Sequence, residues 1–280
     1  MKRVACLALL VLIAGIAVSS AAPQSPTPPA ATPEEVRVYE AFRAWITAQP
    51  RDLQDADDEV VYRRYAATLE AQGHSRKDAA STIALLRKIG DHAEIERWNR
   101  ILTAPAPAFN TAPNAFLVEM IKAVKPGRSL DVGMGQGRNT IYLAQHGWES
   151  VGFDPADRAV AAAQTQAKAL GVKITTSVGR AEEFNWGTAQ WDLIVLSYVG
   201  AREYVAQVSR ALRPGGMVVV EAFHRDATKG HSIGSSVVFD TNELMRLFAP
   251  LRIIRYEDTT DRSDFGSGQT RVVRLAAIKP

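Results

Sequence analysis

Residues 129–147 read SLDVGMGQGRNTIYLAQHG, and this stretch decides the fold. Residues 130–132 predict the end of a short buried strand, and from position 139 the apolar spacing is that of a helix ending at Gly147. Between them lie three glycines at alternate positions: Gly133, Gly135 and Gly137. A glycine loop between strand and helix lets a ligand approach bare backbone and points N–H groups at it. The stretch therefore predicts a ligand site of the nucleotide type.

The spacing of the glycines indicates which ligand is expected. A dinucleotide fingerprint is G-x-G-x-x-G, and its third glycine would fall on Arg138. The run here is D-x-G-x-G-x-G, with Asp131 two positions before the first glycine. Because the third glycine is missing, the glycine run argues against an NAD-dependent dehydrogenase on a similar sheet. Titration with NAD separates this alternative function from the others.

Strands and helices alternate beyond the glycine loop, which predicts a mostly parallel, doubly wound α/β sheet with its ligand at the carboxyl edge. The expected strands after the first are at 151–154, 172–178, 192–196 and 217–221. The end of the chain differs. Strands expected at 251–256 and 272–278 are joined by a polar loop at 259–270 without a helix, so they predict an antiparallel pair.

The N-terminus has the three parts of a secretory signal peptide, which we expect at residues 1–22. Lys2 and Arg3 precede an apolar run that is shorter than a bilayer requires, and small residues follow it. The two basic residues favour a cytoplasmic N-terminus and an exported chain. The expected location is periplasmic, with an uncleaved N-terminal membrane anchor as the alternative. Cys6, the only cysteine, lies in this segment, so no cysteine metal ligand and no metal are expected in the mature protein.

A Pro-rich tether at 23–32 leads into a predicted helical module at 33–104, and the main domain is expected at 109–280. Four helices are predicted in the module. The third runs from Ser75 to a stop at Gly90, and the fourth begins at a capping box of Asp91 and Glu94. The sequence does not indicate what the module does, nor the oligomeric state. The formal net charge of +3 gives no case for a nucleic-acid partner.

Five motifs together resemble class I S-adenosylmethionine-dependent methyltransferases. They are the glycine run, GFDP at 152–155, GRAEEF at 179–184, WDLIVLSYV at 191–199 and LRPGGMVVVEAF at 212–223. The resemblance covers about residues 109–279 and implies a Rossmann-like, seven-stranded sheet with antiparallel last strands. GRNTIYLAQHG and FDTNEL are similar to the tellurite-resistance type of this class. The class implies S-adenosylmethionine as cofactor and, as partner, a small-molecule methyl acceptor whose identity the sequence does not give.

The resemblance also implies which residues bind the cofactor. The three glycines would meet its amino-acid end and ribose, and Asp154 the ribose hydroxyls. Asp131 would either accept from the α-ammonium group or fix the loop. Arg180 stands where the class usually has an acid for adenine, so Glu182 and the backbone of Ala181 are the expected substitutes. Ser197 is expected beside the methyl group.

No catalytic dyad is evident, because alignment alone supplies most of the acceleration when the acceptor is already nucleophilic. The candidates for a base or a bordering group are His224, Glu221 and Tyr198. The tellurite-resistance type is thought to have a histidine in the loop before its last strand, whereas residues 259–270 offer Arg262 but no histidine. Besides the methyltransferase, an exported, non-catalytic nucleoside-binding protein on the same fold remains an alternative function.

Overall fold

The computed structural model describes residues 31–54, 56–228, 233–266 and 268–280. The predicted signal peptide and most of the Pro-rich tether lie outside these ranges. Within them, none of the helices combines the length and the apolar character that crossing a membrane requires.

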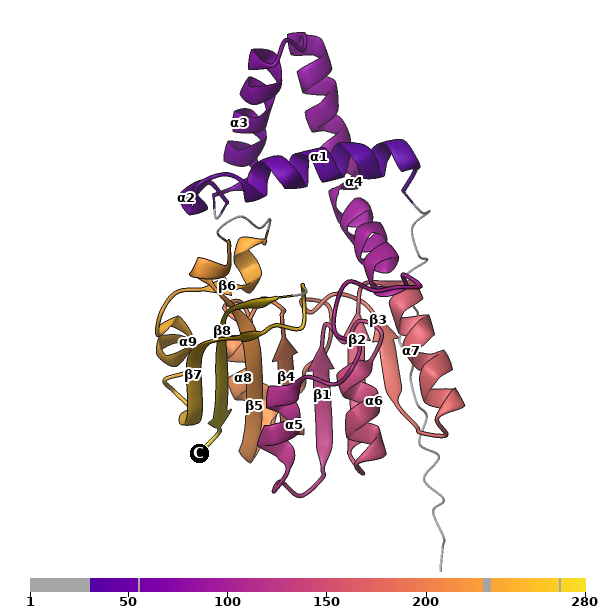
Figure 1. Cartoon of the computed structure of the whole chain (residues 1–280), viewed down its shortest axis with the longest axis vertical. Coiled ribbons are helices and arrows are strands. Elements are labelled where there is room, and N and C mark those ends of the chain that lie inside the picture. Colours follow the sequence, from indigo (N-terminus) through magenta and orange to yellow (C-terminus); the bar gives the residue numbers. More distant parts are fainter. Residues whose placement is uncertain (1–30, 55, 229–232, 267) are drawn as a thin grey trace, which may run out of the picture.

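The N-terminal helices form a separate layer beyond one edge of the sheet, at the top of Figure 1. Helix α1 (Pro33–Thr47) begins with a capping box, in which Thr32 and Glu35 each accept a hydrogen bond from the other's backbone N–H. Helices α2 (Arg51–Gln54), α3 (Asp58–Ala71) and α4 (Arg76–Leu102) follow. Their shared core contains Tyr39, Tyr65, Leu69, Ile83, Leu86 and Ile89.

Helix α4 is one continuous helix, so the predicted break at Gly90 is wrong. A glycine inside a helix costs about 1 kcal/mol relative to alanine. Here Leu86, Ile89 and Ala93 are buried on both sides of Gly90 along the helix, and this burial offsets the cost. Asp91 therefore does not cap a new helix. The uninterrupted α4 extends from the helical layer to the edge of the sheet (Figure 1).

The sheet has the strand order β3-β2-β1-β4-β5-β8-β7. Its parallel strands are β1 (Arg128–Val132), β2 (Glu149–Asp154), β3 (Thr175–Val178), β4 (Trp191–Ser197) and β5 (Leu212–His224), and the antiparallel ones are β7 (Arg252–Arg262) and β8 (Gln269–Ile278). The predicted doubly wound sheet with antiparallel last strands is confirmed. A two-residue strand, β6 (Val238–Phe239), pairs with the end of β5 and makes eight strands where seven were expected.

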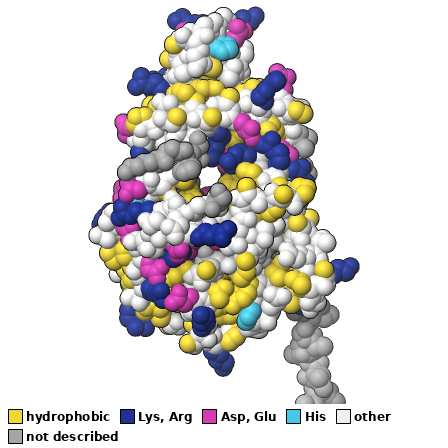
Figure 2. Space-filling model, viewed as in Figure 1, with side chains coloured by type: hydrophobic (Ala, Val, Ile, Leu, Met, Phe, Trp, Pro, Cys, Tyr) yellow, Lys and Arg dark blue, Asp and Glu magenta, His cyan; other side chains and the backbone are white. Residues whose placement is uncertain are grey.

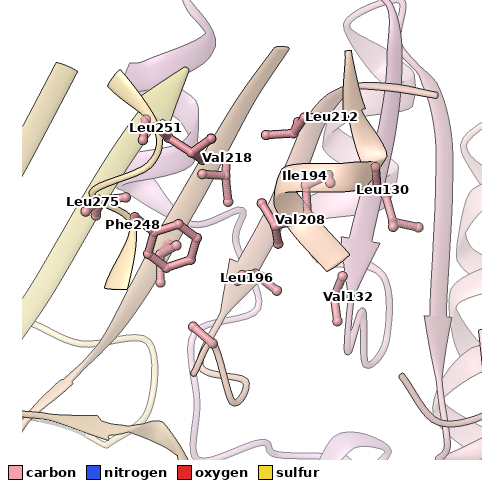
Figure 3. Close-up of a cluster of buried hydrophobic side chains, with 14 of the residues drawn as sticks. Leu130, Val132, Ile194, Leu196, Val208, Leu212, Val218, Phe248, Leu251 and Leu275 are labelled. Carbon is pink, nitrogen blue, oxygen red and sulfur yellow. The ribbon is translucent and has the colours of Figure 1, made fainter. Parts of the chain in front are cut away.

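Helices cover both faces of the sheet. On one face lie α8 (Val205–Ala211) and α9 (Glu243–Leu247), and Figure 3 shows the buried side chains there, which include Leu130, Ile194, Leu196, Val208, Val218 and Phe248. Helices α5 (Ala115–Ile121) and α6 (Arg138–Gln145) cover the other face, over Leu117, Leu143, Trp148, Leu193 and Val219. Helix α7 (Asp157–Ala169) links β2 to β3, and short 3-10 turns lie at Arg225–Thr228 and Ser235–Val237. Because β4 and β5 in the middle of the sheet are covered on both sides, they contain unbroken apolar runs.

The final hairpin is longer than predicted. Strands β7 and β8 pair from Arg252↔Ile278 to Arg262↔Gln269, so the connecting loop shrinks to 263–268. Asp261 of the predicted loop instead pairs with Arg274 across the two strands, beside a second cross-strand pair of Arg271 with Asp258. The short tip of this hairpin lies at the carboxyl edge of the sheet, where the parallel strands end.

Candidate functional site

The glycine loop between β1 and α6 has the backbone conformation that its sequence predicts. Gly133, Gly135 and Gly137 all have φ between 55° and 81°, a region that residues with a Cβ rarely adopt. The Gly135 N–H points at the end of β2, where it donates to Asp154 Oδ2 at 2.9 Å. Turns of this kind expose backbone N–H groups toward the carboxyl edge of the sheet, which suits an anionic or hydroxyl-bearing ligand.

Asp131 lies in β1, two residues before the loop, and binds the first turn of α6. Its carboxylate is fully buried and accepts from the backbone N–H of Thr140 at 3.1 Å and from the Thr140 hydroxyl at 2.7 Å. These contacts tie the end of β1 to α6, the helix that follows the loop. Burial raises the pKa of the Asp131 carboxyl to about 6, although the hydrogen bonds from Thr140 act in the opposite direction.

Replacing Asp131 with asparagine is expected to change how stability depends on pH. The folded-state pKa of Asp131 lies above the ordinary value of 3.8, so the folded protein binds the proton more tightly than the unfolded chain does. Its contribution is fully present below pH 3.8 and is lost as the pH rises through 6. Between pH 4.5 and 7.5 the parent should lose about 2 kcal/mol from this group, relative to Asp131→Asn. Urea unfolding of both proteins at the two pH values checks this, and a difference that does not change with pH would contradict it.

Asp154 lies at the carboxyl end of β2, next to the glycine loop. One carboxylate oxygen accepts from the Gly135 N–H, and the other accepts from the Ala156 N–H at 2.8 Å. The side chain therefore joins the loop to the start of α7. It is 7% exposed, and burial raises the pKa of its carboxyl.

Ser197 ends β4 at the same edge, and it contacts a pair that the sequence interpretation missed. Its hydroxyl accepts from Arg138 Nη2 at 3.2 Å, and the same guanidinium nitrogen donates to Asp264 at 2.7 Å. Asp264 also accepts from the side chains of Asn114, at 2.7 Å, and Asn110, at 2.9 Å. Arg138 and Asp264 are both about nine-tenths buried. The GRN sequence at 137–139 pointed to Arg138 as a residue of the site. Nothing near it in the sequence indicated that its partner would be Asp264 in the β7–β8 tip.

Tyr198 follows Ser197 with φ of 58°, which is unusual for a bulky residue and typical of functional sites. Its hydroxyl donates to Glu221 at 2.6 Å and accepts from the backbone N–H of Asp264 at 3.2 Å. Burial, together with the negative charge of Glu221, raises the pKa of Tyr198 well above its usual value. Tyr198 therefore links the end of β4 to the hairpin tip as a neutral phenol.

The two candidate bases on β5 have structural partners. Glu221 is buried and pairs with Arg274 at 2.7 Å. His224 is also buried: its Nδ1 accepts from the Asp226 N–H at 3.0 Å, and its Nε2 lies 3.0 Å from the Thr241 hydroxyl. Burial lowers the pKa of His224. Both residues reach the carboxyl edge, but neither has a free polar atom directed at the glycine loop.

The segment after β3 contains the residues expected near adenine. Ala181 is half-buried, and its carbonyl accepts from Trp186 Nε1 at 2.9 Å. Glu182 accepts from the Tyr204 hydroxyl at 2.7 Å. Arg180 forms an ion pair with Asp91 of α4, whose carboxylate lies 3.0 Å from the guanidinium. Helix α4 thus reaches the adenine side of the expected site.

The space over the glycine loop is small. The cavity there measures about 40 Å³ and is lined by Leu102, Phe109, Gly133, Gly135, Arg138, Ser197 and Phe265, among others. A larger cavity of about 480 Å³ lies between the α1–α2 connection and the segment from β5 to β6, but it contains none of the predicted site residues. In the part of the chain that the structure describes, no cluster of His, Cys, Asp and Glu is arranged to hold a metal ion.

Fold and site together define a Rossmann-like domain with a glycine loop and an acid at the end of the next strand. Residues 130–216 match the methyltransferase domain family. A ubiquinone biosynthesis O-methyltransferase of Rhizobium etli is 32% identical over 103 residues, which are 35% of this chain and 42% of that protein. These matches support the resemblance to class I, S-adenosylmethionine-dependent methyltransferases that the sequence motifs predicted.

Solved structures show the same fold. An S-adenosylmethionine-dependent methyltransferase from Methanosarcina mazei superposes with a TM-score of 0.51 at 17% identity, over 60% of this chain and 99% of the other. TehB from Haemophilus influenzae has a TM-score of 0.51 at 18% identity, over 60% and 62%. The chain spans only about half the length of the curated relatives it matches, which include a hemagglutinin of Eikenella corrodens matched over 58% of its length.

The residues present fit S-adenosylmethionine. Gly133 and Gly135 present bare backbone to the cavity over the loop. A Cβ on Gly137 would lie 2.7 Å from the Ala163 side chain, so this glycine lets α7 pack closely against the loop.

Asp154 would hold the ribose hydroxyls through the carboxylate lone pairs that its bonds to Gly135 and Ala156 do not use. The backbone of the loop would hold the amino-acid end, and Arg138 and Ser197 border the cavity over the loop. The groups expected at the amino-acid and ribose ends thus lie together at the loop, and the cavity over it is narrow.

Proposed function

We propose that this protein is a methyltransferase that transfers a methyl group from S-adenosylmethionine to a small-molecule acceptor. The observation that carries the proposal is the glycine loop joined to Asp154 at the carboxyl edge of a methyltransferase-type sheet. The match over residues 130–216 and the O-methyltransferase relative support it. TehB, among the solved structures, supports the fold and leaves the acceptor open.

The mechanism proposed relies on alignment. When bound, the cofactor supplies an activated methyl group on a sulfonium cation. The backbone of the glycine loop and Asp154 would fix its two ends, and Ser197 at the end of β4 would border the reacting centre. Orientation in a site closed to water contributes up to about 7–11 kcal/mol to such a reaction. His224 and Glu221 are not given the role of base, because their polar atoms already have partners.

Isothermal titration with S-adenosylmethionine, with its demethylated product and with NAD tests the proposal. We expect binding of the first two and none of NAD. Binding of NAD alone would favour a dehydrogenase. Turnover against a panel of phenols, thiols and oxyanions then separates an enzyme from a non-catalytic nucleoside-binding protein, which would bind the cofactor without releasing its demethylated product.

Asp154→Ala should weaken S-adenosylmethionine binding about tenfold or more, because charge-assisted hydrogen bonds to the ribose are lost along with the tie to Gly135. Titration calorimetry measures the change. Glu149→Ala is the matched control, since this acid lies at the opposite end of the same strand, where it pairs with Arg128, and does not line the cavity over the loop. Equal affinity of Asp154→Ala and the parent would place the cofactor site elsewhere.

We propose in addition that residues 1–22 direct export and that the domain works outside the cytoplasm, in the periplasm. The basic start, the apolar run and the Pro-rich tether support this. A reporter that is active only outside the cytoplasm, fused after Lys279, should be active. A silent fusion beside an active cytoplasmic reporter would contradict export.

A further inference from the structure

Helix α4 lies across the carboxyl edge of the sheet and is tied to the start of α7, next to the expected cofactor site. Asn99 is 3% exposed; its side chain donates to Asp157 at 2.7 Å and accepts from the backbone N–H of Arg158 at 2.9 Å. One helical turn earlier, Glu96 pairs with Arg158 at 2.8 Å. Figure 2 shows Lys and Arg side chains, with acidic ones beside them, gathered where α4 passes from the helical layer to the lower domain.

The last turn of α4 occupies the space above the glycine loop. Leu102 packs in one cluster with Phe109 and with Ala156 and Ala159, which open α7 just after Asp154. A Cβ on Gly135 would lie 3.2 Å from Leu102 Cδ2, so the leucine faces the surface that a ligand would touch. The cavity left here is about 40 Å³, whereas small-molecule pockets usually measure about 300–1,000 Å³.

The hairpin tip completes the cover from the other side. The ring centroid of Phe265 lies 5.6 Å from that of Phe109, 5.2 Å from that of Tyr198 and 6.3 Å from that of Trp98. The backbone N–H of Asn110 donates to the Asp264 carbonyl at 2.7 Å. We call Trp98, Leu102, Phe109 and Phe265 the cap. They come from α4, the segment after it and the β7–β8 tip, and they pack as one unit over the glycine loop.

We propose that the cap is autoinhibitory: the docked helical module and S-adenosylmethionine compete for the same space, so the cofactor binds only when α4 moves away from the loop. This inference rests on the proposed function. The side chains that would hold the cofactor are in place beneath the cap, and what the closed arrangement lacks is room. A ligand that binds only the open form has an apparent affinity reduced by the fraction of molecules that are open.

The contacts that hold α4 against the sheet domain are few and can be broken without unfolding the helical module. The ion pairs of Asp91 with Arg180 and of Glu96 with Arg158 are partly exposed and contribute little. The module has its own apolar core, which the docking contact does not share. What holds α4 down is therefore mainly the buried Asn99 and the apolar contacts of Leu102.

A reversible cross-link tests the proposal in the full chain. In a Cys6→Ser background, Asn99→Cys and Asp157→Cys are bridged with a short bis-methanethiosulfonate reagent, which a reductant removes. We expect the bridged form to bind S-adenosylmethionine at least tenfold more weakly than the reduced form, as measured by calorimetry. The control is Glu59→Cys with Arg87→Cys, an ion-paired couple within the module, whose bridge should leave affinity unchanged.

Leu102→Ala provides a second measurement. It should bind the cofactor more tightly than the parent, because it opens the loop, whereas Leu69→Ala, equally buried in the core of the module, should not. Equal affinity of the bridged and reduced forms, or weaker binding by Leu102→Ala, would overturn the inference and leave the proposed function intact. If no form binds S-adenosylmethionine, the proposed function fails, and the inference fails with it.

Discussion

Replacing Arg274 with methionine is expected to lower the free energy of unfolding by about 3–5 kcal/mol, because it leaves a buried carboxylate without its partner. Arg274 donates to Glu221 at 2.7 Å, and the two side chains are 10% and 2% exposed. Glu221 also accepts from Tyr198, whose hydroxyl in turn accepts from the backbone N–H of Asp264 in the hairpin tip. The substitution should therefore also disturb the structure at the carboxyl edge of the sheet. Urea denaturation at pH 7.5 measures the loss.

Two further variants separate the buried charge from a general effect of removing an arginine. Arg255→Met removes a partly exposed arginine of β7 that also pairs with Glu257, and it should cost at most about 1 kcal/mol. Adding Glu221→Gln to Arg274→Met should restore part of the lost stability, since the unpaired charge is then absent while Tyr198 keeps an acceptor. If Arg274→Met and Arg255→Met cost the same, the Glu221–Arg274 pair is not a buried charge in solution.

The fold could be predicted because its signals are local. The glycine loop, the buried apolar runs and the turn residues each lie within a few positions of the element that they define. The errors arose where tertiary contacts outweighed a local signal. Gly90 reads as a helix stop, but the apolar positions around it are buried. Residues 259–262 read as a loop, but they pair with β8.

The residues at the strand ends of the site could be predicted because their signals are also local. The cap over them could not be predicted. Asp131, the glycines and Asp154 lie at strand ends that a parallel sheet brings to one edge. By contrast, Asp264 reaches Arg138 across 126 positions, and Leu102 reaches Gly135 from a different layer of the molecule. Periodicity shows that Leu102 belongs to an apolar helix face, but not which surface that face covers.

Gly135→Val is expected to reduce S-adenosylmethionine binding by about a hundredfold or more, that is, below detection in a calorimetric titration. Gly135 has φ of 55°, where a residue with a Cβ is strained by roughly 1–2 kcal/mol. The branched side chain would also occupy the surface of the loop that faces Leu102, so neither the cofactor nor the cap could approach it. The strain alone would lower stability without removing a ligand site, and the two effects must be measured separately.

Gly171→Val is the matched control, because it carries the same strain without the same location. Gly171 follows α7 with φ of 69°, and no atom lies within 4 Å of the position of its Cβ. Both variants should therefore lose a similar free energy of unfolding in urea, while only Gly135→Val loses the cofactor. Undiminished binding by Gly135→Val would show that the cofactor does not lie on the glycine loop. Equal loss of binding in both variants would instead attribute the effect to stability, because Gly171 lies at the opposite end of α7 from Asp154 and the glycine loop.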